Sequence, residues 1–132
     1  MDRLQYGNWI PGAVIRVFSK RRGVWHFGIL GTSWGTVWHA SKDRGQFVLT
    51  TFDEFAEGQP DAYTWIPDSS EVQQAVLARA ASQQGKRYNL LNANCEDLVT
   101  WIVTGKARSP QRETAVALSL ALSFVLALLI GS

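Results

Sequence analysis

Apolar and polar residues alternate in short runs along the first half of the chain. The runs are 13–18, 24–30, 36–40, 46–52 and 63–66, and turn-forming stretches such as GTSWG separate them. Runs of this length, rich in β-branched and aromatic residues, predict strands. The segment 53–60 is polar and has room for one helical turn. We therefore expect a sheet built from consecutive strands.

The periodicity changes after Pro67. Asp68, Ser69 and Ser70 are N-cap candidates for a helix over 71–84, which Gly85 would end. A second helix is predicted over 95–104, closed by a glycine at 105. Because the strands come first and the helices follow, the pattern predicts an α+β fold with an antiparallel sheet packed on helices.

A third apolar segment lies near the C-terminus. Residues 114–130 carry no charge over 17 positions, and a helix of that length spans about 25 Å, close to the thickness of a bilayer core. Lys106, Arg108 and Arg112 precede it, and basic residues stay on the cytoplasmic side. We predict a catalytic domain over 8–110 facing the cytoplasm and a single-pass C-terminal membrane anchor over 114–130. A buried core helix and a monotopic insertion remain alternatives.

Composition narrows the function classes. The chain has 132 residues, 46% of them hydrophobic and 18% charged, which is typical of one globular domain. A net charge of +2 does not favour nucleic acid as a partner. The single cysteine excludes an internal disulfide, and the N-terminus has no apolar run typical of a secretory signal.

That cysteine, Cys95, stands at the start of the second predicted helix. At helical spacing, Cys95 lies on the same side of this helix as four apolar residues: Leu98, Val99, Ile102 and Val103. Free backbone N–H groups and the positive end of the helix dipole favour a thiolate at this position and could bind an oxyanion. The alternative is that Cys95 is a small buried core residue.

The two histidines, His26 and His39, both fall in predicted strands. If the loop between the strands is 31–34, Leu30 faces Gly35 and His26 faces His39, so both side chains point to one face of the sheet. A Cys-His-His site results if the Cys95 helix covers that face. Two ordinary strand histidines, or a zinc site of the same three residues, are alternatives.

These segments resemble the lecithin:retinol acyltransferase-like family, and within it the small phospholipase A/acyltransferases. The matching segments occur in the family's order and are PGAVIRVF, WHFGIL, VWHAS, GKRYNLLNANCEDLV and GKARSPQ, followed by a hydrophobic tail. The family usually continues Asn-Cys-Glu with histidine and an aromatic residue, whereas this chain has Asp97 and Leu98.

The resemblance implies a circularly permuted papain-like fold with Cys95 as nucleophile, His26 as general base and His39 as orienting residue. It implies a thiol acyltransferase of phospholipase A1/A2 type. An acyl group would pass from a membrane glycerophospholipid to Cys95 as a thioester, and then to water, an amine or a lysophospholipid. The route needs no cofactor and no metal. The acyl acceptor, the positional preference and the oligomeric state are left open.

Two other functions are compatible with the same residues. One is a papain-like amidase or peptidase, and the other is a non-catalytic membrane-associated module of the same fold. Four cations, Arg16, Lys20, Arg21 and Arg22, precede His26, and they form either a solvated loop or a contact with lipid phosphates. Trp34 is a candidate for the membrane interface. Three other tryptophans are expected in the core: Trp25, Trp38 and Trp101.

Overall fold

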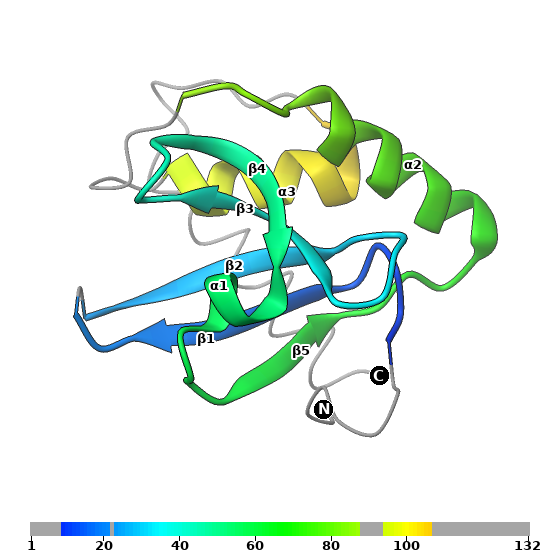
Figure 1. Cartoon of the computed structure of the whole chain (residues 1–132). Helices are drawn as coiled ribbons and strands as arrows, with labels where there is room; N and C mark the ends of the chain where they lie inside the picture. The colour runs from blue at the N-terminus through cyan, green and yellow to red at the C-terminus, as the bar shows by residue number, and fades with distance from the viewer. Residues whose placement is uncertain (1–8, 22, 88–93, 107–132) are drawn as a thin grey trace.

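The alternating runs build one sheet, as the sequence predicts. The computed structural model describes residues 9–21, 23–87 and 94–106, with the backbone alone for 94–96. Within these ranges an antiparallel sheet has the strand order β4-β3-β2-β1-β5 (Figure 1). Its strands are β1 (Val14–Ser19), β2 (Val24–Leu30), β3 (Thr36–Ser41), β4 (Gln46–Thr51) and β5 (Asp61–Trp65).

Three helices accompany the sheet in the described ranges: α1 (Phe52–Ala56), α2 (Ser70–Ser82) and α3 (Asn94–Thr104). The short α1 occupies the polar connection after β4, where the Thr51 side chain caps it by accepting from the Glu54 N–H. Ser69 caps α2 in the same way through the Val72 N–H. The predicted α+β class is therefore confirmed.

The predicted membrane anchor, residues 114–130, lies outside the described residues. The end of the predicted catalytic domain lies there too. None of the helices in the described ranges combines the length and the apolar composition that a membrane span requires.

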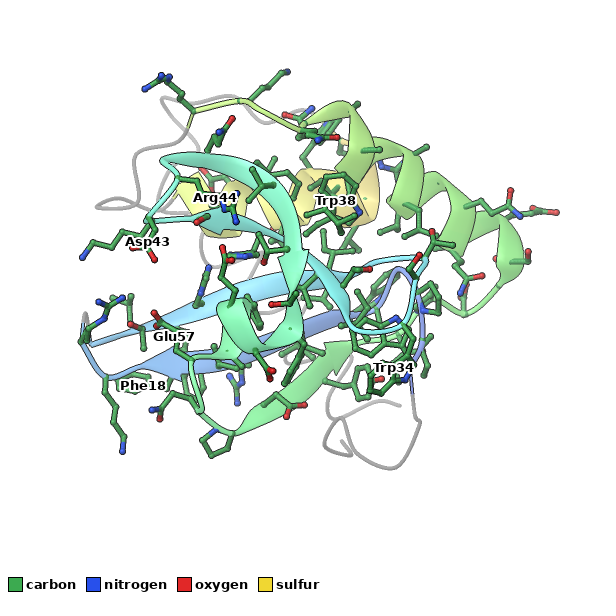
Figure 2. All side chains as sticks on the ribbon, in the orientation of Figure 1. Phe18, Trp34, Trp38, Asp43, Arg44 and Glu57 are labelled. Carbon is green, nitrogen blue, oxygen red and sulfur yellow. The ribbon has the colours of Figure 1, made fainter. Side chains whose placement is uncertain are left out.

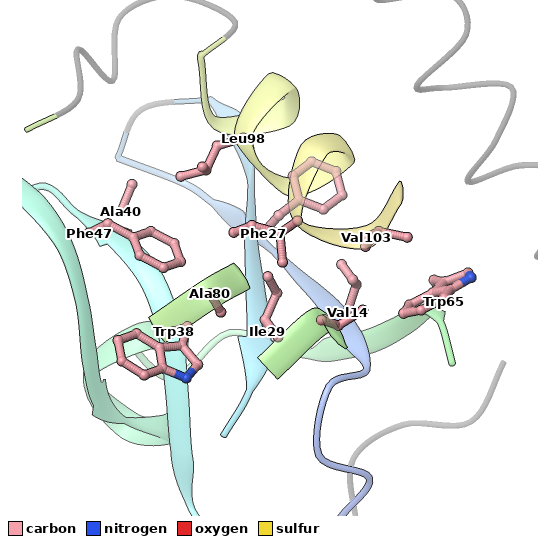
Figure 3. Close-up of a cluster of buried hydrophobic side chains, with 12 residues drawn as sticks. Val14, Phe27, Ile29, Trp38, Ala40, Phe47, Trp65, Ala80, Leu98 and Val103 are labelled. Carbon is pink, nitrogen blue, oxygen red and sulfur yellow. The ribbon is translucent and has the colours of Figure 1, made fainter. Parts of the chain in front are cut away.

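Alternation along the strands divides the core between the two faces of the sheet. On one face Val14, Phe27, Ile29 and Trp38 pack with side chains of α2 and α3 (Figure 3). On the other face Ile15, Leu30 and Val37 pack with Phe55 and Ala56 of α1. The sheet is thus a middle layer between α1 and the α2–α3 pair.

The helices α2 and α3 are tied together at one end of α3. Arg79 of α2 donates from Nε to the Ile102 carbonyl at 2.6 Å and from a terminal nitrogen to the Val103 carbonyl at 3.2 Å. These carbonyls belong to the last turn of α3, where no further helical N–H follows. Gly105 ends the helix with a left-handed backbone, φ 73°. This tie fixes the direction of α3 and hence the place of its N-terminus.

Candidate active site

His26 and His39 are not directly opposite each other, so the predicted register is wrong. The ladder between β2 and β3 pairs Ile29 with Trp38 and Leu30 with Val37. Six residues, 31–36, therefore separate the paired positions Leu30 and Val37, two more than expected. The register continued along the strands puts Gly28 opposite His39. A shift of two residues keeps each side chain on its face. The prediction that both histidines share one face is confirmed.

The two imidazoles meet in spite of the offset. Their ring centroids are 5.1 Å apart at an interplanar angle of 70°, an edge-to-face arrangement. Both residues are buried, with exposed fractions of 8% for His26 and 2% for His39. Phe55 of α1 packs against both rings, with centroids at 4.8 and 5.2 Å. Diagonal neighbours across strands are within reach of ring side chains, which explains the contact.

Gly28 makes room for this aromatic cluster. A Cβ at position 28 would lie 2.6 Å from Val37 Cγ1 and 2.8 Å from Phe55 Cε1. Any side chain there would force Val37 or Phe55 to shift. The glycine in this strand therefore has a packing function, because it allows α1 to approach the sheet closely.

A backbone carbonyl selects the tautomer of His26. Its Nε2 lies 3.3 Å from the Ala40 carbonyl oxygen on β3. A carbonyl oxygen only accepts, so Nε2 carries the proton in this hydrogen bond. In the neutral ring the basic nitrogen is then Nδ1. A neutral ring in this tautomer can accept a proton at Nδ1, as a general base requires.

Thr50 holds His39, and the sequence did not single this residue out. His39 Nε2 and Thr50 Oγ1 are 2.6 Å apart, and the Thr50 hydroxyl donates to the Thr51 carbonyl at 3.3 Å. With the Thr50 hydroxyl donating to the Thr51 carbonyl, its oxygen can accept from His39 Nε2–H. Strand pairing explains this contact. His39 is opposite Val48 on β4, and Thr50, two residues further along β4, lies on the same face as Val48.

The helix α3 covers the face opposite the histidines along its length. Leu98 packs in one cluster with Phe27 and Ala40, the chain neighbours of His26 and His39. In Figure 3, Leu98 lies toward Phe27 and Ala40, whereas Val103 lies toward Val14 and Trp65. The first turn of α3 is therefore at the histidine end of the sheet.

At that end β3 turns away from β2 (Figure 1). The condition that the Cys95 helix covers the histidine face is not met by the body of the helix. Its N-terminal end instead adjoins the two strands where they diverge. Cys95 is the second residue of α3, and its side chain lies outside the described part of the chain.

A small pocket opens beside the histidines on the α1 face. Its lining is largely charged and polar: Arg21, His26, His39, Ser41, Lys42, Asp43, Glu54, Phe55 and Glu57. Arg21 pairs with Glu57 at 2.8 Å, and Arg44 pairs with Glu54 at 3.1 Å (Figure 2 labels Arg44 and Glu57). Hydrogen bonding by Arg44 holds the pKa of the Glu54 carboxyl below its usual value. The pocket thus presents fixed charges of both signs to a ligand beside the imidazoles.

Sequence comparison identifies the family. The lecithin retinol acyltransferase family model matches residues 24–108, a range that includes His26, His39 and Cys95. The chain belongs to the lecithin retinol acyltransferase family. A comparison with curated proteins finds no match to this chain. The resemblance seen in the histidine strands and the Asn-Cys-Glu segment is confirmed at the level of the family.

The lecithin retinol acyltransferase domain contains most of the tryptophans. Trp38 is buried and Trp101 packs against the same cluster, as predicted. Trp25 is 47% exposed, so the prediction of a core position is wrong. Trp34 is 72% exposed in the β2–β3 connection. Its proposed contact with a membrane stays a prediction.

The zinc hypothesis needs Cys95 as a ligand, and the structure does not describe the Cys95 side chain. Among those described, no group of three or more histidine, cysteine, aspartate or glutamate residues is arranged to hold a metal ion. Cys95, the third ligand in that hypothesis, is not one of them.

Proposed function

We propose that this chain is a cysteine-dependent acyltransferase and phospholipase A that acts on membrane glycerophospholipids. The observation that carries the proposal is the buried His26–His39 pair at the end of the sheet where α3 begins, in a chain of the lecithin retinol acyltransferase family. Within that family we assign it to the small phospholipase A/acyltransferases, with a permuted papain-like fold.

The first half of the proposed reaction acylates the cysteine. His26 Nδ1 takes the proton of the Cys95 thiol, and the thiolate attacks the ester carbonyl carbon of the phospholipid. The first-turn N–H groups of α3 have no intrahelical acceptor, so they are available to the oxyanion that forms. The ester C–O bond then breaks, and His26 returns the proton to the departing lysophospholipid oxygen. Cys95 is left as a thioester.

The second half transfers the acyl group. Water, an amine or a lysophospholipid hydroxyl gives up a proton to His26 and attacks the thioester carbonyl, and the Cys95 thiolate leaves and is reprotonated. The charged pocket on the α1 face opens beside both imidazoles. A polar acceptor can approach His26 through it without crossing the apolar core. This access supports transfer to a polar acceptor as well as to water.

His39 serves as the orienting residue in this proposal. Its ring lies edge to face against His26, and Thr50 anchors its Nε2. Held from two sides by Phe55 and His39, the His26 ring has little freedom to rotate. A general base that is already oriented loses less entropy on reaching the transition state.

The intermediate can be detected directly. The purified chain is mixed with phosphatidylcholine liposomes, and its intact mass is recorded at early times beside Cys95→Ala. We expect a fatty-acyl mass increment that hydroxylamine reverses and that the variant lacks. Absence of both the adduct and released fatty acid would refute the proposal and favour an amidase or a non-catalytic module. Cys95→Ser is a second control, since full activity in that variant would also exclude the thioester.

We further propose that residues 8–110 form the catalytic domain and that residues 114–130 anchor it to a membrane from the cytoplasmic side. The support is the uncharged stretch of 17 residues preceded by cations. Anchoring would raise the local concentration of a substrate that lies in the bilayer. Deleting residues 114–132 should release the domain from sedimented membranes. A truncated chain that still sediments with them would exclude an anchor at this position.

A further inference from the structure

Three of the large hydrophobic residues that are exposed in the described ranges gather at one end of the β1–β2 hairpin. Phe18 is 38% exposed, Val24 46% and Trp25 47%. Phe18 and Trp25 are partners in the ladder, and their rings meet edge to face at 5.2 Å. The hairpin end extends from the rest of the sheet, with Phe18 near its tip (Figure 2). The apolar surface at this end of the hairpin therefore includes both faces, with Phe18 and Trp25 on one face and Val24 on the other.

Phe18 and Trp25 continue a buried face of the sheet toward the end of the hairpin. Phe27 follows Trp25 on the same face of β2 and is covered by α3 residues such as Leu98. Trp25, the next residue outward on this face, is 47% exposed. Exposure on this face of β2 therefore rises from Phe27 to Trp25 at the end of the hairpin. Large apolar groups left exposed in this way are typical of an interaction surface.

Cations surround the apolar surface. The segment from residue 14 to residue 30 contains four cations and no carboxylate. The Arg16 guanidinium lies 4.1 Å from the centroid of the Trp25 ring. Lys20 and Arg21 are exposed at the turn, and Arg21 pairs with Glu57. Aromatic side chains bordered by cations match the two layers of an anionic bilayer surface, apolar tails below phosphates.

We propose that the end of the β1–β2 hairpin is a lipid-contacting surface. Phe18, Val24 and Trp25 enter the interfacial region of an anionic phospholipid bilayer, and Lys20 and Arg21 contact its phosphates. Because Trp25 precedes His26, this contact would hold the histidine pair at the lipid surface. The inference goes beyond the proposed chemistry and does not depend on it, since it concerns binding and not catalysis.

The first experiment tests the contact of Trp25 with lipid. Full-length Cys95→Ala, which lacks the proposed nucleophile, is incorporated into phosphatidylcholine–phosphatidylserine vesicles with or without brominated acyl chains. We expect bromine to quench part of the tryptophan fluorescence. Trp25→Phe should lose the share that comes from Trp25, and it should do so equally in a Trp34→Phe background, in which the other exposed tryptophan is altered. Both substitutions keep an aromatic ring, so the fold is retained.

Two results would overturn the proposal. One is quenching that Trp25→Phe leaves unchanged. The other is a Trp25 signal that varies with the protein-to-lipid ratio, because a second copy of the chain would then cover the surface. Neither result bears on the thioester, since the background variant has no Cys95 thiol.

The second experiment tests whether the positive charges of Lys20 and Arg21 contribute to lipid contact. Neutralising Lys20 and Arg21 to glutamine should lower Trp25-dependent quenching in anionic vesicles and remove its dependence on salt. The matched control neutralises Lys86 and Arg87, two exposed cations on another part of the surface, and should leave the quenching unchanged. Equal effects of the two double variants would contradict a specific contact at the hairpin.

Discussion

The imidazoles of His26 and His39 meet edge to face at 5.1 Å although the register of the β2–β3 pairing offsets them by two residues. The offset lets each ring keep its own anchor, the Ala40 carbonyl for His26 and the Thr50 hydroxyl for His39. The diagonal arrangement therefore explains how two buried imidazoles can be packed and hydrogen-bonded together.

Thr50→Val should slow catalysis. The substitution keeps the shape of the side chain and removes the hydroxyl that His39 Nε2 contacts at 2.6 Å. A hydrogen bond of this kind contributes about 1 kcal/mol, which corresponds to a roughly five-fold lower turnover if it is expressed wholly in the rate. The measurement is kcat and its pH profile with liposomal substrate. Thr50→Ser should restore both, and a Thr50→Val enzyme with unchanged kcat and pH profile would exclude a role for this residue in orienting His39.

Gly28→Ala should destabilise the domain by roughly 1–3 kcal/mol, the usual cost of overpacking a core. The new methyl group would lie within 3 Å of Val37 and Phe55. Removing the Val37 methyl groups should relieve part of the clash. In a double-mutant cycle measured by chemical denaturation, Gly28→Ala and Val37→Ala together should therefore cost less than the sum of the two. Strictly additive costs would mean that the sheet moves apart instead of straining at this contact.

Arg79→Met should loosen α3. The arginine donates to the Ile102 and Val103 carbonyls at the end of the helix, and hydrogen bonds from a charged donor contribute about 1.5–3 kcal/mol. We expect a loss of free energy of unfolding in that range, measured by denaturation in a mild detergent. Arg21→Met is the matched control, because its partner Glu57 is exposed and surface ion pairs contribute little. Equal losses in both variants would argue against a special role for Arg79.

The free energy of unfolding should fall at high pH because the buried Tyr63 phenol ionises. Burial raises the pKa of this phenol from its usual 10.0 to about 12. Because the folded-state pKa is the higher one, the associated stability is fully present below pH 10.0 and is lost as the pH rises toward about 12. This rise in pKa corresponds to a loss of roughly 2–3 kcal/mol in the free energy of unfolding. Tyrosinate absorbance should show one late-titrating phenol that Tyr63→Phe removes. Titration of every tyrosine near pH 10 would contradict the burial argument.

Much of the fold follows from local patterns in the sequence. The strand-forming residues of VWHFGIL predict β2 with its observed bounds, and Ser69 is among the predicted caps of α2. Such features depend on neighbouring residues, whose periodicity and capping chemistry are written directly in the chain. For the same reason the sequence places both histidines on strands and on a common face. The family could also be recognised, because its motifs are short segments that occur in a fixed order.

The tertiary structure decided how these elements meet. The length of the β2–β3 connection set the register and put Gly28 opposite His39. The direction of α3 placed its body over the far face of the sheet and its first turn beside Phe27 and Ala40. Thr50 and Phe55 became neighbours of the histidines only through strand pairing and the packing of α1. Contacts between distant segments depend on the whole set of packed side chains, and a local pattern does not contain that information. The sequence by itself therefore determined which chemical groups the site contains and which elements carry them. Their mutual positions were decided by the tertiary structure, because they arise from long-range packing.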